Sequence, residues 1–376
     1  MDFSLSDDQQ LLKDSVERFI ERDYPFDGRQ AASRSDDGFN RDTWATFAEL
    51  GWLGAALPEA YGGTGGGGVE IMVMMEALGR GLVVEPILPS VVLGGGIVRL
   101  AGSEEQKQAL LPAMVEGNKL LAFGYAEPQS RYDLHDVALA ATRDGNGYVL
   151  NGHKSVVLNG DTADTLIVSA RTSGERRDKD GISLFVVDRG ADGLDVRGYP
   201  TVDGQRAAEL NFDGVHLGAD ALLGTEGQAL GAIERVIDEA TAAVCAEALG
   251  IMAVLNDTTL EYLKTREQFG KPLGSFQALQ HRMVDMFVAR EESIGLANVA
   301  SMRIDDGGDQ ERKRCVSAAK VQIGRAGRLV GQEAVQLHGG IAMTDEYKVG
   351  HYFKRISMIG RLFGDLDHHL DRFIAL

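Results

Sequence analysis

The fold is decided by the stretch at residues 229–273, ALGAIERVIDEATAAVCAEALGIMAVLNDTTLEYLKTREQFGKPL. Its apolar residues recur every three or four positions, which is the spacing of an α-helix. Gly270 and Pro272 end that pattern. Between Ala240 and Leu255 the sequence is almost wholly apolar, so we expect a helix that is buried on most sides.

One charged residue, Glu247, interrupts the apolar part of this helix. The residues three and four positions away are Ala243, Val244, Gly250 and Ile251, so no neighbour on the same helix can neutralise it. A buried carboxylate without compensation is costly, and its pKa tends to rise. Two interpretations stay open: Glu247 reaches another element for a buried hydrogen bond, or it is a general base tuned by burial.

Length, charge and cysteine content restrict the class of protein. A chain of 376 residues has room for two or three domains. Its formal charge of −18 and pI near 4.9 argue against nucleic acid or an anionic membrane as partner. Cys245 and Cys315 lie in helical apolar patterns, so reduced thiols and a cytoplasmic location are expected. Residues 1–19 predict an acidic helix beginning at Ser6 instead of a signal peptide, and no apolar run could span a membrane.

The chain reads as three successive domains of mixed α and β structure. Residues 1–118 have helical periods and predict an N-terminal α-helical domain. Residues 119–228 contain short β-branched runs separated by DGNG, NG and DG turns, which predict a central antiparallel β-domain. Helical periods return in residues 229–376 and predict a C-terminal helical bundle. The glycine-rich residues 62–68 lack the Lys-Ser/Thr of a phosphate-binding loop and are interpreted as a turn.

Motifs along the whole chain resemble those of acyl-CoA dehydrogenases. Residues 266–270, Arg-Glu-Gln-Phe-Gly, resemble the Arg-x-x-Phe-Gly motif of that family, and residues 336–340, Gln-Leu-His-Gly-Gly, resemble its Gln-x-x-Gly-Gly loop. Residues 126–128 (Ala-Glu-Pro) and 151–154 (Asn-Gly-His-Lys) fall where the family has Thr/Ser-Glu-Pro and Asn-Gly-x-Lys-x-Trp. The resemblance extends to the small subunit of pimeloyl-CoA dehydrogenase and similar heteromeric enzymes. It implies the three-domain acyl-CoA dehydrogenase fold, with a four-helix bundle at the C-terminus.

The resemblance also implies FAD as cofactor, and no metal. Arg266 is permanently charged and forked, which suits a pyrophosphate, and Gly339 and Gly340 let a backbone approach phosphate closely. In the family these residues reach the FAD of a neighbouring subunit, so a tetramer that is a dimer of dimers is expected. The alternatives are a surface ion pair for Arg266 and a plain helix-ending turn for the glycines. The implied cofactor-binding residues are Tyr125, Ala126, Val156, Leu158, Arg266, Gln268, Phe269, Phe276, Gln277, Gln336, Gly339 and Gly340.

The sequence departs from the family at its catalytic base. The usual base is the Glu of an aromatic-Glu-Gly-Thr segment, and counting on from Gly340 places Phe363 at that position. Some relatives place the base on the long helix instead, at a position that falls near Ala240. Glu247 lies two turns further along nearly the same face, so it is the first candidate for the base. Asp365, at the family's Thr position, is the second candidate. A non-catalytic subunit is the alternative to both.

The β-domain departs as well. Ala126 replaces a hydroxyl residue that normally bonds the flavin, and Val156 and Leu158 stand where a Trp and a Thr normally lie beside it. Backbone N–H groups at Ala126 and Leu158 could still serve the ring. Residues 131–133, Arg-Tyr-Asp, replace the Gly-Ser-Asp that contacts the thioester. These changes favour a chain that works with a more typical partner subunit.

The reaction implied by the resemblance is α,β-dehydrogenation of an acyl-CoA to a trans-2-enoyl-CoA, as in the β-oxidation of fatty acids. A carboxylate takes the α-proton, the β-hydrogen leaves as hydride to the flavin, and an electron-transfer flavoprotein takes the electrons. Substrate contacts are expected from Tyr132, Asp238 and Thr241. Two alternatives remain: an assembly subunit that completes the FAD site of a partner, and a flavin oxidase or monooxygenase on the same scaffold.

Overall fold

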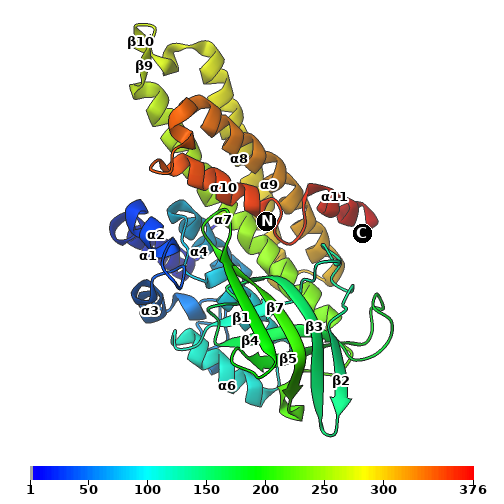
Figure 1. The fold of residues 1–376 in the computed structure, drawn as a ribbon. Coiled ribbons are helices and arrows are strands. Elements are labelled where there is room, and N and C mark those ends of the chain that lie inside the picture. The colour runs from blue at the N-terminus through cyan, green and yellow to red at the C-terminus, as the bar shows by residue number, and fades with distance from the viewer. Residues whose placement is uncertain (1–2) are drawn as a thin grey trace. The chain divides into compact units, whose positions relative to one another are not determined.

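The computed structural model describes residues 3–376 and divides into two compact units. The first unit contains the segment that ends at Ala31, residues 67–83 and residues 241–376, and the second contains residues 32–66 and 84–240. Helices, strands and then helices follow one another along the chain, as the sequence predicts (Figure 1). The expected boundaries after residues 118 and 228 follow chain order and stay a prediction. Among the described residues, no helix is both long and apolar enough to cross a membrane.

The helical elements follow the predicted periods closely. The long helix predicted from residue 229 is α7 (Leu230–Thr265), one continuous helix. The serine start predicted at Ser6 is confirmed, because Ser6 and Gln9 form a capping box at the first turn of α1. The other helices of the first unit are α1 (Asp7–Asp23), α4 (Gly68–Gly81), α8 (Gln277–Asp306), α9 (Asp309–His338), α10 (Lys348–Ile359) and α11 (Leu366–Ala375), with the short η5 (Leu273–Ser275), η6 (Gly339–Met343) and strands β9 (Glu267–Gln268) and β10 (Lys271–Pro272).

The second unit is built around a mixed sheet with the strand order β6-β7-β3-β2-β4-β5-β8. The predicted hairpin at the DGNG turn is confirmed, because β2 pairs with β3 across it. The prediction of a purely antiparallel sheet is wrong for two strand pairs, because β1 and β2 each pair with β4 in parallel. The chain can form the pair of β1 with β4 because β2 and β3 lie between them in sequence. The strands are β1 (Leu121–Gly124), β2 (Ala140–Asp144), β3 (Gly147–Leu158), β4 (Thr165–Arg171), β5 (Ile182–Asp188), β6 (Leu194–Pro200), β7 (Arg206–Leu217) and β8 (Leu222–Leu223).

Helical segments that precede the sheet in sequence complete the second unit. The bulge-like π-helix η3 (Ile87–Gly95) is buried throughout and is followed directly by α5 (Gly96–Ala101). Ser90 links η3 to β1, because its Oγ accepts a hydrogen bond from Leu121 N at 3.0 Å. The remaining elements of this unit are α3 (Arg41–Glu49), α6 (Glu104–Val115), η1 (Trp52–Gly54), η2 (Glu59–Tyr61) and η4 (Ala219–Ala221). The helix α2 (Phe26–Ser33) contains the boundary between the two units after Ala31.

Two glycines allow α4 and α7 to touch backbone to backbone beside Glu247. A Cβ added at Gly79 would lie 2.2 Å from the carbonyl oxygen of Glu247, and one added at Gly250 would lie 1.9 Å from that of Glu76. No side chain larger than hydrogen fits at either position without moving a helix. The crossing therefore fixes the position of Glu247 relative to α4.

We expect Gly250→Ala to lower the free energy of unfolding by about 1–3 kcal/mol, because the added methyl forces α4 and α7 apart. Urea denaturation followed by circular dichroism measures this difference. The control is Gly231→Ala in the same helix, where a Cβ meets nothing within 4 Å. That variant should be as stable as the parent or slightly more so. Equal stability of the two variants would contradict the close crossing.

Candidate functional site

The predicted base, Glu247, is buried, and both oxygens of its carboxylate accept hydrogen bonds from an arginine. Arg355 of α10 donates from Nε to Glu247 Oε1 at 2.6 Å and from its terminal nitrogen to Oε2 at 2.7 Å. Both side chains are almost completely buried, at 7% and 6% exposure for Arg355 and Glu247. This is a bidentate charge-assisted pair, and it occupies both oxygens of the Glu247 carboxylate. The interpretation of Glu247 as an uncompensated carboxylate ready to take a proton is therefore wrong, and the buried hydrogen bond was the correct alternative.

Sequence reasoning missed Arg355, although a signal for it exists. In α10 the buried residues Val349, Tyr352, Ile356 and Ile359 recur at helical spacing, and Arg355 falls on the same face. A permanently charged residue on an apolar face requires an acidic partner on another element. Glu247 on α7 is likewise a charged residue in a buried apolar segment and needs a partner of opposite charge from another element. Pairing the two buried faces would have predicted the contact.

We expect Glu247→Gln to lower the free energy of unfolding by about 3–5 kcal/mol, because it leaves the buried charge of Arg355 without its partner. The double variant Glu247→Met with Arg355→Met should recover most of this loss, since it removes both buried charges and keeps apolar volume. Chemical denaturation of the parent, of Glu247→Met, of Arg355→Met and of the double variant measures the coupling between the two side chains. Additive effects of the two changes would contradict the pair.

The loop that carries Phe363, where the family has its base, is held by two buried side chains. Lys320 donates to the carbonyl oxygens of Leu362 at 2.8 Å and Gly364 at 2.6 Å. His369 Nε2 lies 3.1 Å from the carbonyl oxygen of Phe363. Phe363 itself has a φ of +59° and is buried. The backbone of this turn is thus fixed, but it presents an aromatic ring where the family presents a carboxylate.

Lys320 and His369 are both buried bases beside this loop. Burial lowers the pKa of Lys320 to about 8. Burial, with the nearby charge of Lys320, lowers the pKa of His369 to about 3. The imidazole is therefore neutral at physiological pH, which fits an Nε2–H that donates to Phe363.

We expect His369 to make the protein less stable in acid. Its pKa falls from 6.5 to about 3 on folding, so between these pH values the unfolded chain binds a proton that the folded chain excludes. The free energy of unfolding should fall as pH is lowered through this window, by up to about 1.4 kcal/mol per pH unit from this group. Urea denaturation at several pH values measures the slope.

The matched variants are His369→Gln, whose amide can still donate to Phe363, and His216→Gln, whose parent side chain is 71% exposed. His369→Gln should flatten the slope and His216→Gln should leave it unchanged. An unchanged slope in His369→Gln would show that another group excludes the proton.

Asp365, the second candidate for the base, begins the next helix. Its Oδ1 accepts a hydrogen bond from His368 N at 3.0 Å, so it is the N-cap of α11. This role explains an acidic residue at the position without any catalysis. Its role as a base stays a prediction.

In the β-domain, the predicted flavin contacts Ala126 and Val156 come together. The carbonyl oxygen of Ala126 accepts from Ser155 N at 2.9 Å, next to Val156. Val156 is 48% exposed and has a φ of +53°, an unusual backbone conformation for a β-branched residue. The register of β3 against β7 shifts between Lys154 and Val157, so Val156 lies in a β-bulge. Leu158 follows at the end of the strand and pairs with Ala207.

A buried ion pair fixes the segment that contains Ala126. Lys154 donates to Glu127 Oε1 at 2.6 Å, to Ser169 Oγ at 3.0 Å and to the carbonyl oxygen of Tyr125 at 3.3 Å. Burial alone would raise the pKa of Glu127, but the charge and hydrogen bond of Lys154 outweigh it and hold that pKa below its usual value. Burial also raises the pKa of Tyr125. The backbone at residues 125 and 126, where flavin contacts are predicted, is therefore held in place by this ion pair.

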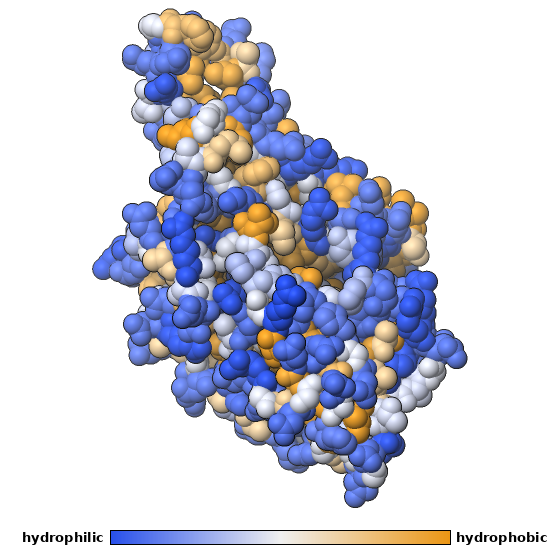
Figure 2. Space-filling view, in the orientation of Figure 1, coloured by the Kyte–Doolittle hydropathy of each residue, from blue (hydrophilic) through white to orange (hydrophobic). Residues whose placement is uncertain are grey.

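At the far end of α7, the segment 266–270 forms a hairpin with an exposed aromatic tip. Gln268 pairs with Lys271, and the two residues between them, Phe269 and Gly270, have φ values of +56° and +78°. Two positive φ values in a two-residue loop are the conformation of a type I′ turn, where Gly and Asn are preferred over Phe. Phe269 is 90% exposed, and Figure 2 shows hydrophobic surface at the end of the molecule where β9 and β10 lie. A strained and exposed Phe is a sign of function.

Arg266 precedes this hairpin and its guanidinium is free within residues 3–376. The alternative of a surface ion pair with Glu267 or Glu261 is not found within these residues, where Glu261 pairs with Lys264 at 2.8 Å instead. Phe276 supports the hairpin: its ring lies 6.1 Å from that of Phe269 and 4.3 Å from Lys271 Nζ. Gln268 and Gln277 are exposed beside them.

The Gln336–Gly340 segment lies at the same end of the first unit. His338 stacks on Tyr262, with ring centroids 4.5 Å apart, and so joins the end of α9 to the end of α7. Gln336, Gly339 and Gly340 are exposed, and a Cβ added at either glycine would meet nothing within 4 Å. Gly339 has a φ of +66°, which favours glycine, whereas Gly340 has no positive φ among the described residues and a Cβ there would meet open space. The structure therefore gathers Arg266, Phe269 and this open loop at one end.

The predicted substrate contacts lie in less open surroundings. Tyr132 lies beside Arg131, whose guanidinium carbon is 5.5 Å from the centre of the Tyr132 ring. Asp238 and Thr241 are both almost completely buried on α7. Their roles toward a substrate stay predictions.

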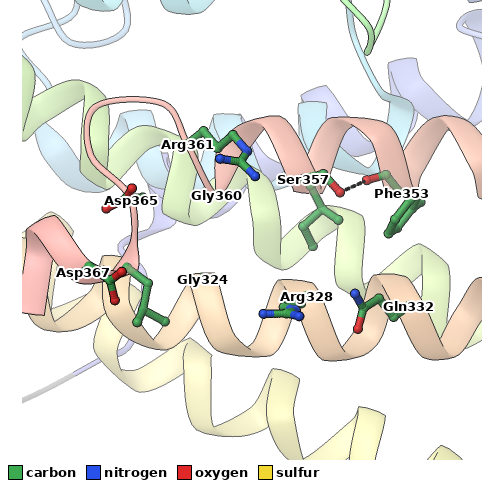
Figure 3. Close-up of a pocket in the computed structure, with 11 residues that line it drawn as sticks. Gly324, Arg328, Gln332, Phe353, Ser357, Gly360, Arg361, Asp365 and Asp367 are labelled. Atoms are coloured by element: carbon green, nitrogen blue, oxygen red, sulfur yellow. Dashed lines mark hydrogen bonds between the residues drawn. The ribbon is translucent and has the colours of Figure 1, made fainter. Parts of the chain in front are cut away.

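A groove of about 560 Å³ lies between α9, α10 and the start of α11. Figure 3 shows the residues that line it. Arg328 and Gln332 line it from α9, Arg361 from the end of α10, and Asp365 and Asp367 from the turn into α11. Ile356 and Leu366 form apolar parts of its wall. The groove was not anticipated from the sequence, because its residues come from three separate segments. Among residues 3–376, no group of His, Cys, Asp and Glu side chains is arranged to hold a metal ion.

Family models match nearly the whole chain. The model of the acyl-CoA dehydrogenase N-terminal domain matches residues 6–118, that of the middle domain residues 122–215, and that of the C-terminal domain residues 227–372. The short-chain specific acyl-CoA dehydrogenase of Clostridium acetobutylicum is 30% identical over 93% of this chain and 92% of its own length.

Solved structures with the same fold cover the chain completely. Butyryl-CoA dehydrogenase from Megasphaera elsdenii superposes with a TM-score of 0.91 at 28% identity, over 100% of this chain and 99% of its own. A chain of the ChsE4-ChsE5 complex from Mycobacterium tuberculosis superposes with a TM-score of 0.90 at 26% identity, over 100% and 98%. The fold expected from the sequence motifs is confirmed.

Proposed function

This chain belongs to the acyl-CoA dehydrogenase family, and on that premise we propose that it is a subunit of an FAD-dependent enzyme that dehydrogenates an acyl-CoA thioester. In this proposal the chain binds FAD through Arg266, Phe269 and the Gln336–Gly340 loop, and a different subunit supplies the catalytic base. The observation that carries the proposal is the contrast between Arg266, directly after the C-terminal end of α7, and Glu247 in the middle of that helix. Arg266 is free and exposed, whereas Glu247 is buried and paired with Arg355.

The residues at the Arg266 end fit a dinucleotide. An unpaired guanidinium offers a forked donor for a pyrophosphate, and the open backbone at Gly339 and Gly340 allows phosphate to approach. Phe269 offers a rigid apolar face for a ring or a neighbouring subunit. Because these groups point away from their own chain, they support a cofactor shared between subunits.

Bound FAD would accept the hydride that leaves the β-carbon of the thioester. The role of this chain is to hold and orient the flavin. Lys154 and Glu127 fix the segment at Tyr125 and Ala126, and the bulge at Val156 forms the neighbouring edge. Backbone N–H groups there replace the hydroxyl groups that the sequence lacks, as the family resemblance suggests.

The missing group is the base. Phe363 cannot take a proton, and Glu247 has no free oxygen. A base supplied by another subunit is consistent with the ChsE4-ChsE5 complex, whose structure contains two named chains. We further propose an electron-transfer flavoprotein as the acceptor and, because Cys245 and Cys315 are free thiols, a reducing compartment such as the cytoplasm.

We expect Arg266→Ala to weaken FAD binding by about tenfold or more, because a charge-assisted hydrogen bond to phosphate contributes about 1.5–3 kcal/mol. Fluorescence quenching of FAD titrated with the purified chain measures the affinity. The control is Arg189→Ala, which removes an exposed arginine of the other unit that has no side-chain partner in residues 3–376. Equal loss in both variants would contradict a role for Arg266.

The proposal that this chain binds FAD while a different subunit supplies the base is tested with the isolated chain loaded with FAD. A panel of acyl-CoA thioesters is added to it. We expect no bleaching of the flavin absorbance, because the chain lacks a free base. Bleaching by any member of the panel would show that the chain carries its own base. Asp365, the second candidate, would then replace the partner subunit as the proposed source of the base. Oxygen consumption in the same assay would instead indicate a flavin oxidase.

A further inference from the structure

The bulge in β3 lies opposite a glutamate of the neighbouring strand β7. The register of β3 against β7 shifts between Lys154 and Val157. Ser155 and Val156 of β3 therefore lie opposite one residue of β7, Glu209. An extra residue interrupts the hydrogen-bond ladder of a strand pair and leaves a backbone group at the bulge without its strand partner. That backbone group requires an acceptor from elsewhere.

The side chain of Glu209 supplies this acceptor. Its Oε1 accepts a hydrogen bond from Val156 N at 3.3 Å. The same oxygen accepts a hydrogen bond from Tyr199 Oη of β6 at 2.7 Å, and Oε2 lies 2.7 Å from His153 Nε2 of β3. Because β7 lies between β6 and β3 in the sheet, the carboxylate is held from both neighbouring strands.

These contacts favour the ionised form of the carboxylate. Burial alone would raise the pKa of Glu209, but the hydrogen bonds from Tyr199 and His153 outweigh burial and hold that pKa below its usual value. An ionised carboxylate accepts stronger hydrogen bonds than a neutral acceptor does. The N–H group of Val156 at the bulge is therefore bonded to a charged acceptor that is itself fixed in place.

The bulge determines how two predicted flavin contacts, Val156 and Leu158, are presented. Side chains alternate between the two faces of a strand, so one extra residue exchanges the faces of all residues beyond it. With the bulge in place, Val157 is buried in the core of the sheet and Leu158 is only half-buried. Val156 has a positive φ and gains no burial from it, because 48% of its side chain stays exposed. A strained residue that is kept at the surface indicates a function for this edge of β3.

We propose that Glu209 is a positioning residue of the flavin site, because its carboxylate holds the bulge that presents Val156 and Leu158. This inference rests on the proposed function, in which FAD lies against that edge of β3. Glu209 acts through the backbone of β3 and not through contact with the cofactor. By fixing that backbone, it restricts a bound flavin ring to one orientation.

Amide hydrogen exchange of the full chain without FAD tests whether Glu209 holds the bulge. Glu209→Ala should make the amides of residues 155–157 exchange about tenfold faster or more, because the bulge loses its acceptor. The matched control is Asp195→Ala, which removes an exposed acidic side chain from β6 that has no polar partner in the described part of the chain. This variant should exchange as the parent does. Unchanged exchange in Glu209→Ala would overturn the proposal.

The redox equilibrium of the bound flavin tests whether the bulge positions the cofactor. At saturating FAD, Glu209→Ala should shift the equilibrium between oxidised and reduced flavin by about tenfold, as equilibration with a dye of known potential measures. Glu209→Gln should stay within about threefold of the parent, because its amide oxygen still accepts from Val156 and only the charge is lost. An equal shift in both variants would show that the charge of Glu209 acts on the flavin, and would overturn the proposal.

Thermal denaturation shows whether these variants fold. If Glu209→Ala does not fold, Tyr199→Phe replaces it, because this change removes one hydrogen bond to the carboxylate and keeps the ring. It should move amide exchange and the flavin equilibrium in the same directions by about threefold, and parental values in it would overturn the proposal.

The outcome also separates this inference from the proposed function. A parent chain that binds no FAD would overturn the proposed function and this inference with it. A parent chain that binds FAD, with a flavin equilibrium that is the same in Glu209→Ala, would overturn this inference alone.

Discussion

The pair of Glu247 and Arg355 is the constraint on which the interpretation of this protein depends. Burying two full charges is costly, and the two short guanidinium contacts, at 2.6 and 2.7 Å, offset that cost. The same geometry that makes the pair tolerable in the core removes Glu247 from acid–base chemistry. Residue type and burial alone suggested a base. Its hydrogen-bond partner reverses that conclusion.

The surroundings of the pair are rigid. The backbone contact at Gly79 and Gly250 leaves no room for α4 and α7 to slide, and Tyr352, one turn before Arg355, hydrogen-bonds the carbonyl oxygen of Arg80. The helix α10 is thereby attached to α4 and α7 by consecutive turns. The loop after α10 continues this pattern, because Lys320 and His369 hold its carbonyl groups. The turn is therefore fixed through its backbone, with the buried ring of Phe363 at the position where the family resemblance predicts a carboxylate.

Much of the fold was predictable because it depends on local periodicity. The period of α7, the serine cap at Ser6 and the DGNG hairpin each follow from short-range rules. The parallel pairing of β1 with β4 was missed, because pairing between distant strands leaves no mark in either strand's own pattern. The contact between Glu247 and Arg355 was missed for the same reason, since 108 positions separate the partners. Motif resemblance located Arg266 and Gly339, but only the structure shows that both are open.

The exposed Phe269 has a consequence for how the protein is produced. Its aromatic ring is held outside the surface by a left-handed backbone and meets the ring of Phe276, yet it stays 90% exposed. An exposed aromatic ring is a point of non-specific adhesion. The purified chain is therefore expected to adhere to other proteins through the tip of one hairpin.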